Sequence, residues 1–237
     1  MLKNIFKNLS RLNFKNFVKL IAYKLKKKLK IQPSKSETEL YVFYGYLVKH
    51  NGFLIQETDE FYQINFKGNK SKFIKLRKRP SSDLDVFYQI YGDTEYLPLI
   101  KCYESNFGNQ NNYVLNIIDA GSNIGLTSLF FTDYFNRAKI VAVEPDSQNF
   151  KLLDFNLSKR ANFEYVKVKG AVWSSNAKIR VINDFRDQSD WSFRVEESDE
   201  VNAIEAYTIN YLADSNGFDY IDILKIDIEG SEKHIFD

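Results

Sequence analysis

The sequence predicts an α/β protein: a doubly wound, mostly parallel sheet preceded by an N-terminal α+β extension. From residue 115 onward, short apolar segments alternate with segments of helical periodicity, which is typical of parallel strands joined by helices. The first of these strands runs into a glycine-containing turn in V-L-N-I-I-D-A-G-S-N-I-G-L-T-S-L-F-F (114–131), as at many ligand sites of such sheets. A hydrophobic content of 44% in 237 residues is enough for a substantial core.

Residues 1–30 are expected to form a basic amphipathic helix. They hold ten of the 33 Lys and Arg residues and no acid, so the remainder is net acidic and is not expected to bind nucleic acid. Apolar residues at helical spacing form a stripe along this segment, and the stripe is interrupted near Asn13 and Asn16. Two interpretations stay open: peripheral contact with an anionic membrane, or a solvated helix that packs one stripe on its own domain or a partner. The stripe consists of Leu2, Ile5, Leu9, Leu12, Ile21, Leu25 and Leu29.

Cysteine and histidine are scarce in this chain. Cys102 is the single cysteine, so no intramolecular disulfide is possible, and one Cys with two His cannot make a zinc cluster at the usual spacing. No apolar run is long enough for a secretory signal or for a membrane span of about 20 residues. We therefore expect no metal site and a cytoplasmic location.

The extension is expected to contain helices and a small sheet. Residues 31–36 predict a linker, because they contain a proline and two serines, and close a first segment at 1–36. An extension or lid over 37–110 then opens with a helix at 37–50 and continues as an antiparallel meander at 52–76, where apolar and polar residues alternate. A short helix follows from Ser82 to Gly92.

The domain expected over 111–237 carries the parallel sheet. Its predicted strands cover 115–119, 139–145, 163–172 and 221–230, its helices 125–135, 147–158 and 208–214, and a β-hairpin 178–199. The chain stops soon after the fourth strand, whereas sheets of this class usually continue for several more strands. We therefore expect a sheet truncated after its fourth core strand, either as a fragment of a longer protein or as one that another chain completes.

Ligands of an open parallel sheet bind at the carboxyl ends of its strands. Glu144 ends the second strand, where a carboxylate accepts hydrogen bonds from a ribose diol. The residues at the four strand ends are Asp119, Gly121, Ser122, Asn123 and Gly125; Glu144 and Pro145; Ala171, Val172 and Trp173; and Asp227 and Glu229.

The composition of the loop 119–125, after the first strand, indicates which class of ligand it can bind. Asn123 stands where a dinucleotide-binding loop has its second glycine, and no basic residue follows before Arg137, which disfavours a pyrophosphate. An acidic, amide-lined loop suits a cationic or zwitterionic ligand better. S-adenosylmethionine meets this description, with its ribose at Glu144, its adenine against the apolar stretch 171–173 and its ammonium and sulfonium on the acidic side.

Four segments carry a family resemblance: L-R-K-R-P-S-S-D-L-D-V-F-Y-Q-I-Y-G-D-T-E-Y at 76–96, D-A-G-S-N-I-G at 119–125, V-E-P at 143–145 and L-K-I-D-I-E-G-S-E at 224–232. In this order they resemble the FkbM-type S-adenosylmethionine-dependent methyltransferases. The resemblance implies a class I methyltransferase, Rossmann-like fold. It also implies O-methylation of a hydroxyl group on a saccharide, glycolipid or polyketide-like product.

The resemblance also implies roles for individual residues. The loop 119–125 would lie on the methionine side of the cofactor, and Glu144 would hold its ribose. Arg77, Ser82 and Asp83 are expected to close over the cofactor, with Arg77 beside the methionine carboxylate.

Methyl transfer needs an in-line approach of the acceptor oxygen and removal of its proton. Asp227 or Glu229 is expected to orient or deprotonate the hydroxyl, and His234 is the other titratable candidate. Structural roles stay open for each: Asp227 as a helix cap, Glu229 as an ion-pair partner of Lys225, and His234 as a surface residue. Trp173 has a similar alternative as a core residue.

Two other functions stay open. One is a nicotinamide-dependent oxidoreductase on a similar sheet, against which the missing middle glycine counts. The other is a non-catalytic cofactor-binding module that keeps the sheet without an acceptor pocket.

Overall fold

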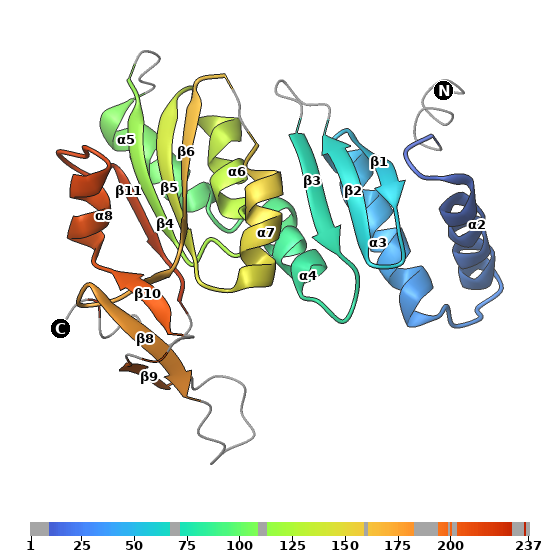
Figure 1. Ribbon diagram of the computed structural model, residues 1–237. Coiled ribbons are helices and arrows are strands. Elements are labelled where there is room, and N and C mark those ends of the chain that lie inside the picture. Colours follow the sequence, from blue (N-terminus) through green and yellow to red (C-terminus); the bar gives the residue numbers. More distant parts are fainter. Residues whose placement is uncertain are drawn as a thin grey trace. The chain divides into compact units, whose positions relative to one another are not determined.

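A computed structural model describes residues 10–66, 72–108, 113–158, 161–182, 194–198, 200, 203–228 and 235. The chain divides into two compact units, Met1–Glu95 and Tyr96–Asp237 (Figure 1). None of the helices within these described ranges has the length and apolar character needed to cross a bilayer.

The first unit combines helices with a three-stranded sheet. Its strands pair antiparallel in the order β1-β2-β3, which confirms the meander expected over 52–76. The helix expected over 82–92 is divided, because its second half widens into a π-helix. The elements are α2 (Phe14–Lys28), α3 (Lys35–Lys49), β1 (Gly52–Glu57), β2 (Phe61–Phe66), β3 (Lys72–Arg77), α4 (Asp83–Phe87) and the π-helix η1 (Tyr88–Asp93).

Side-chain caps set the starts of α2 and α3. The Asn13 side chain accepts a hydrogen bond from the Asn16 backbone N–H at 2.9 Å, which begins α2. At α3, Ser34 and Glu37 form a capping box: the Glu37 N–H donates to Ser34 Oγ at 3.2 Å, and the Ser34 N–H donates to Glu37 Oε2 at 2.8 Å. Each cap satisfies a backbone N–H that the helix itself leaves without a partner.

The N-terminal helix differs from the one expected over residues 1–30. Leu2, Ile5 and Leu9 lie outside the described residues, and α2 begins at Phe14. Leu12 was assigned to the apolar stripe with Ile21, Leu25 and Leu29, but it is buried whereas those three are exposed. A 3.6-residue periodicity identifies apolar faces but not which of them packs on the domain, and this explains the difference.

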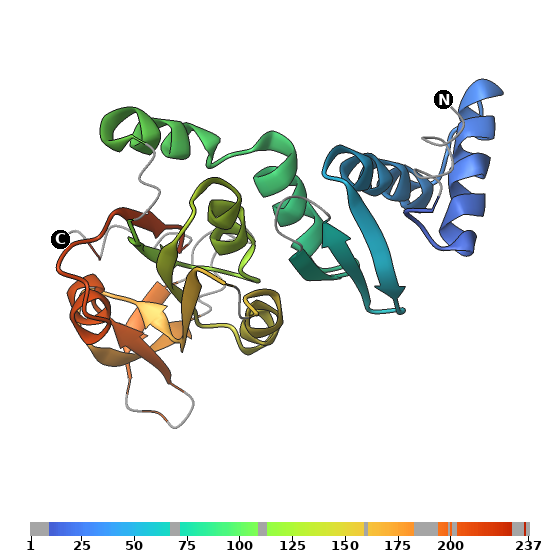
Figure 2. The ribbon, with the colours of Figure 1, turned by 90° about the horizontal axis from the view of Figure 1, so that it is seen from above.

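The second unit is built on the parallel sheet that the sequence predicts. Its strands lie in the order β11-β4-β5-β6, and all neighbouring pairs are parallel. Figures 1 and 2 show α8 on the opposite side of this sheet from α6 and α7. The elements are β4 (Leu115–Ala120), α6 (Leu126–Tyr134), β5 (Ala138–Glu144), α7 (Ser147–Asn156), β6 (Phe163–Lys169), α8 (Ile209–Ser215) and β11 (Ile223–Ile226).

Both faces of the central strands are buried. On one face Ile118 and Val141 pack against Leu212 and Ala213 of α8. The alternate residues of β4 are equally buried: Ile117 and Asp119 have no exposed surface. Strands covered on both faces are typical of doubly wound sheets and explain why these segments are almost wholly apolar in sequence. A helix that the sequence analysis did not assign, α5 (Leu97–Phe107), precedes the sheet.

A second sheet continues from the end of β6. It has the order β7-β10-β8-β9, with β7 (Ala171–Val172) parallel to β10 (Ile204–Tyr207) and the hairpin of β8 (Ala177–Ile182) and β9 (Arg194–Glu197) antiparallel. The pairing of β8 with β9 confirms the hairpin expected over 178–199. That this hairpin belongs to a separate sheet was not predicted from the sequence.

The predicted third strand, 163–172, is wrong as a single strand. It breaks at Gly170, whose N–H donates to the Glu144 carbonyl at 3.2 Å before the chain enters the second sheet. A Cβ at Gly170 would lie 2.6 Å from the Glu205 carbonyl oxygen of β10. Glycine therefore permits the close approach of β10 at the point where the chain leaves the main sheet.

Candidate functional site

The strand order places a topological switch point between β4 and β11. From β4 the chain proceeds outward through β5 to β6, and then returns to β11 on the other side of β4. Open α/β sheets bind ligands outside the carboxyl ends of the strands at such a point. Two of the predicted groups lie here: Asp119 near the end of β4 with the loop after it, and Asp227 directly after β11.

The first half of the loop 119–125 is hydrogen-bonded to β5 and to the residue after β11, the strands on either side of β4. The N–H groups of Gly121 and Ser122 both donate to the Val143 carbonyl of β5, at 3.0 and 2.9 Å. On the other side the Asp227 N–H donates to the Ala120 carbonyl at 3.2 Å. Gly121 has φ +73°, and a Cβ there would overlap the Asp227 carbonyl oxygen and lie 2.9 Å from its carbon. A side chain at this position would push β11 away from the loop.

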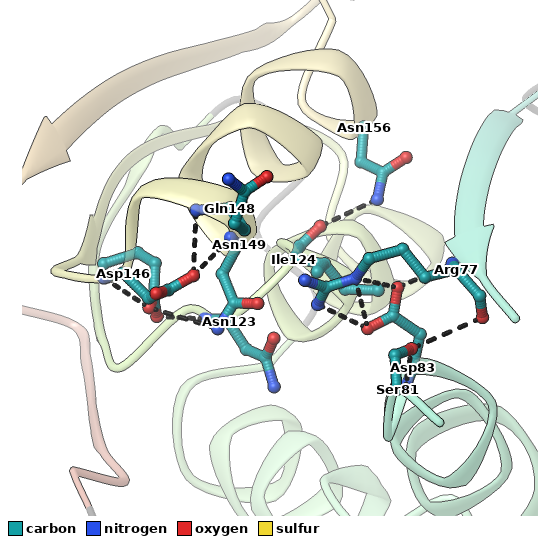
Figure 3. Close-up of polar contacts among 10 residues, drawn as sticks. Arg77, Ser81, Asp83, Asn123, Ile124, Asp146, Gln148, Asn149 and Asn156 are labelled. Atoms are coloured by element: carbon teal, nitrogen blue, oxygen red, sulfur yellow. Dashed lines mark hydrogen bonds and ion pairs between the residues drawn. The ribbon is translucent and has the colours of Figure 1, made fainter. Parts of the chain in front are cut away.

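Asn123 and Gly125 complete the turn in left-handed backbone conformations. Their φ angles are +50° and +82°. Asn is among the few residues other than glycine that tolerate the left-handed region, so the loop adopts this conformation with Asn123 in place of a glycine. The second half of the loop is held by Asn156 of α7, which is fully buried and donates from Nδ2 to the Ile124 carbonyl at 2.8 Å (Figure 3).

Glu144 ends β5 with a buried carboxylate that has three N–H donors. Oε2 accepts from the Asn123 backbone at 2.8 Å, and Oε1 accepts from the Asp146 backbone at 3.0 Å and from Asn149 Nδ2 at 3.3 Å. Burial raises the pKa of Glu144 above its ordinary value, although these hydrogen bonds oppose the shift. A carboxylate accepts about four hydrogen bonds, so the described residues leave one position, on Oε2.

Asp146 fixes the start of α7 beside this carboxylate. Its Oδ1 accepts the backbone N–H groups of Gln148 and Asn149, both at 2.8 Å (Figure 3). Such a cap satisfies two free N–H groups of the first turn and orients the helix that carries Asn149. Pro145, between Glu144 and Asp146, is half-buried.

Asp119 and Lys225 form a buried ion pair between β4 and β11. They are register partners, their charged atoms Oδ1 and Nζ are 3.2 Å apart, and both side chains are at least 95% buried. Lys225 Nζ also donates to the carbonyls of Ala120 at 3.2 Å and Gly121 at 2.6 Å. The other oxygen of Asp119 accepts from Ser128 Oγ of α6 at 2.6 Å. Burial opposes the ammonium charge, but neighbouring Asp119 raises the pKa of Lys225 above its ordinary value.

The three catalytic candidates predicted near the end of the fourth strand, β11, are Asp227, Glu229 and His234. The structure describes Asp227, whose side chain is 62% exposed and lies 3.7 Å from Lys225 Nζ. Glu229 and His234 lie outside the described residues. Asp227 thus presents a carboxylate at the carboxyl end of β11, beside the loop.

The apolar stretch after β6 lies in the second sheet. Ala171 is half-buried and Val172 is buried in β7. Trp173 packs with Ile179 and Ala206 as a buried core residue, which is the alternative raised from the sequence. Contact of these three residues with an adenine stays a prediction.

Arg77 and Asp83 belong to the first unit, where they form an ion pair. Arg77 donates from Nη2 to Asp83 Oδ1 at 2.7 Å and from Nε to both oxygens, and its backbone N–H donates to Oδ2 at 2.7 Å (Figure 3). Asp83 is almost completely buried, whereas Ser82 contributes its carbonyl to the first turn of α4. In the structure the Arg77 guanidinium therefore holds a carboxylate of the protein, and its pairing with a cofactor stays a prediction.

Comparison with protein-family models decides the family. Residues 119–237 match the model described as Methyltransferase FkbM domain. The chain belongs to the FkbM methyltransferase family. Comparisons with curated proteins and with solved structures give no significant match.

The match confirms the resemblance found in the sequence and identifies the protein as a methyltransferase. In this FkbM methyltransferase the matched segment begins at Asp119, one residue before β4 ends, and it includes Glu144, Lys225 and Asp227. The fold seen here, a parallel four-stranded sheet with helices, is consistent with an α/β Rossmann-like methyltransferase.

Three polar residues that shape the candidate site of the FkbM methyltransferase were not predicted from the sequence. Lys225 was considered only as a partner of Glu229, although a lysine inside the apolar run I-L-K-I signals a buried charge with a specific partner. Asn156 and Ser128 are fully buried polar residues in helices, and each bonds to the loop or to Asp119. No sequence pattern marks these two residues, because Asn and Ser are common on exposed helix faces.

We predict that Gly121→Ala destabilises the protein more than a change at an unobstructed glycine does. Gly217→Ala is the matched control, because Gly217 has a similar φ of +69° but no atom within 4 Å of the added Cβ. The control should lose about 1–2 kcal/mol from the left-handed conformation alone. Gly121→Ala should lose more, because it adds the overlap with Asp227; urea denaturation measures both. Equal losses would show that β11 does not approach the loop as described.

The buried pair is tested by a double-mutant cycle of Lys225→Met and Asp119→Asn. Lys225→Met should cost about 3–5 kcal/mol, because it leaves a buried carboxylate without its counter-charge. The double variant should lose less than the sum of the single variants, with a coupling of about 0.5–3 kcal/mol in denaturation experiments. Lys178→Met removes a cation from a pair in which both side chains are more than half exposed, and should cost under about 1 kcal/mol. Additive losses in the cycle would contradict the pairing.

Proposed function

We propose that this methyltransferase uses S-adenosylmethionine and transfers its methyl group to a hydroxyl oxygen of a saccharide, glycolipid or polyketide-like acceptor. The observation that carries the cofactor proposal is the Glu144 carboxylate. It lies at the carboxyl end of β5, and its Oε2 is held by the Asn123 N–H of the loop at the switch point. In sheets of this kind a carboxylate after the second strand accepts ribose hydroxyls.

The chemistry of the loop supports a sulfonium nucleoside over a dinucleotide. No Lys or Arg lies between Asp119 and Asn136 in the sequence, so the loop and helix α6 carry no cation for a pyrophosphate. The nearby ammonium of Lys225 is directed at two backbone carbonyls and Asp119. The family match supports methyl transfer and gives no support to the oxidoreductase alternative.

Glu144 has room for one direct hydrogen bond from a ribose. Three of its roughly four acceptor positions are used by Asn123, Asp146 and Asn149, which leaves one on Oε2. A second hydroxyl would bind Oε1 only after Asn149 Nδ2, at 3.3 Å the longest of the three bonds, moves aside. We propose that Glu144 accepts one ribose hydroxyl and that Asn149 is the neighbouring group that adjusts.

When bound, S-adenosylmethionine supplies an electrophilic methyl group on a sulfonium. The chain's part is to hold the nucleoside, align the acceptor and receive the hydroxyl proton. We propose that Asp227 accepts the proton of the acceptor hydroxyl, because its exposed carboxylate follows β11 at the carboxyl edge of the sheet. Glu229 and His234 are the other candidates. The loop 119–125 would lie along the methionine moiety, and the stretch 171–173 along the adenine.

The proposal predicts that the full chain binds S-adenosylmethionine and S-adenosylhomocysteine, but not NAD, in isothermal titration calorimetry. Glu144→Ala should weaken this binding by about 10- to 100-fold, the loss of a hydrogen bond to a charged group of about 1.5–3 kcal/mol. Glu164→Ala is the matched control, because that carboxylate on β6 is 65% exposed and should leave binding unchanged. Selective NAD binding would overturn the proposal, as would unaltered binding by a folded Glu144→Ala protein.

The pH dependence of binding separates a direct role of Glu144 from a structural one. Burial raises its pKa above 4.5, and only the ionised carboxylate accepts with both oxygens. The affinity for S-adenosylhomocysteine should therefore fall as the pH decreases through this raised pKa, beginning above pH 4.5. Glu144→Gln, which keeps the size of the side chain, should lack this decrease. The same acid dependence in that variant would assign the effect to another group.

A further inference from the structure

Helix α2 has two apolar faces, and in the part of the chain that the structure describes only one of them is packed. Leu20 and Tyr23 are buried, and the ring of Tyr23 stacks on Tyr41 of α3 with centroids 4.4 Å apart. The second apolar face is exposed. It consists of Phe14 (80% exposed), Val18 (48%), Ile21 (42%), Leu25 (54%) and Leu29 (67%), which we call the outer stripe.

The outer stripe is continuous along the helix. Its members are separated by four, three, four and four residues, so at about 100° per residue they fall within an arc of about 80°. Leu20 and Tyr23 point to the opposite side of the helix. Single exposed apolar residues are ordinary, but a stripe of four along a 15-residue helix, continued by a fifth at its C-cap Leu29, marks an interaction surface.

Exposed lysines border the outer stripe on both sides. By the same helical geometry Lys15 and Lys19 lie along one border, and Lys24 and Lys28 along the other, and all four are exposed. Lys26 differs from them, because it pairs with Glu37 of α3 at 2.8 Å. The sequence has no acid before Glu37, so nothing on this helix neutralises the bordering charges.

This arrangement favours one kind of partner. In a dimer formed through the outer stripe, the lysine borders of two copies would face each other without acids to balance them. A bilayer with anionic headgroups offers both complements: acyl chains for the stripe and negative charge for the lysines, whose long side chains reach up to the headgroups. We propose that α2 lies in the interface of an anionic membrane with its outer stripe inserted. The inference is independent of the methyl donor proposed above.

The test is sedimentation of the full chain with lipid vesicles. Binding to vesicles of phosphatidylcholine mixed with phosphatidylglycerol should be at least about tenfold tighter than to pure phosphatidylcholine, and should weaken as salt is added. Val18→Ser, Ile21→Ser and Leu25→Ser combined keep every charge and should lower binding at least about tenfold. The matched control combines Ile55→Ser and Phe73→Ser, two apolar residues of the same unit that are 52% and 45% exposed.

A second variant tests the charge alone. Lys19→Glu, Lys24→Glu and Lys28→Glu combined keep the outer stripe and should abolish the preference for anionic vesicles, while circular dichroism checks that both variants retain their helices. Equal binding of the native chain to neutral and anionic vesicles would overturn the proposal, as would no binding at all. A dimer in light scattering that dissociates when the stripe is changed to serine, without vesicle binding, would instead assign the stripe to a second copy.

Discussion

The buried ion pair between Asp119 and Lys225 is the interaction on which the carboxyl edge of the sheet depends. It joins β4 to β11 across the switch point, and the lysine also donates to the carbonyls of Ala120 and Gly121. Taking two charges out of water is costly, and the cost is offset only where each charge has further hydrogen bonds. Here the ammonium also donates to two backbone carbonyls and lies 3.7 Å from Asp227, and the carboxylate also accepts from Ser128, so the pair holds the start of the loop against β11.

The loop then connects this pair to Glu144. Gly121 and Ser122 bond to the Val143 carbonyl, and one residue further the Asn123 N–H bonds to the Glu144 carboxylate. Loop position and carboxylate position are therefore coupled through one short stretch of backbone. A preorganised acceptor at the end of β5 follows from this coupling, since three N–H donors hold the carboxylate in place before any ligand binds.

Much of this arrangement could be predicted from the sequence, and the remainder could not for identifiable reasons. The alternation of apolar strands and helices predicted the parallel sheet. The rule that ligands bind at the carboxyl ends of parallel strands then selected the loop 119–125 and Glu144. The ion pair was missed because its members are 106 residues apart in the sequence, and register between distant strands is not a local property. The second sheet was missed for the same reason, since β7 pairs with β10 across an intervening hairpin. The outer stripe of α2 was only partly predicted, because periodicity does not say which face the protein covers.

We propose that the loop 119–125 and the Glu144 region together form the cofactor site. Hydrogen–deuterium exchange of the full chain, with and without S-adenosylhomocysteine, tests this most directly because it locates the ligand without requiring an acceptor. Exchange should slow in the segments 119–125 and 144–149 and stay unchanged in the meander 52–66. Binding that protects other segments, while these two exchange as before, would place the cofactor elsewhere.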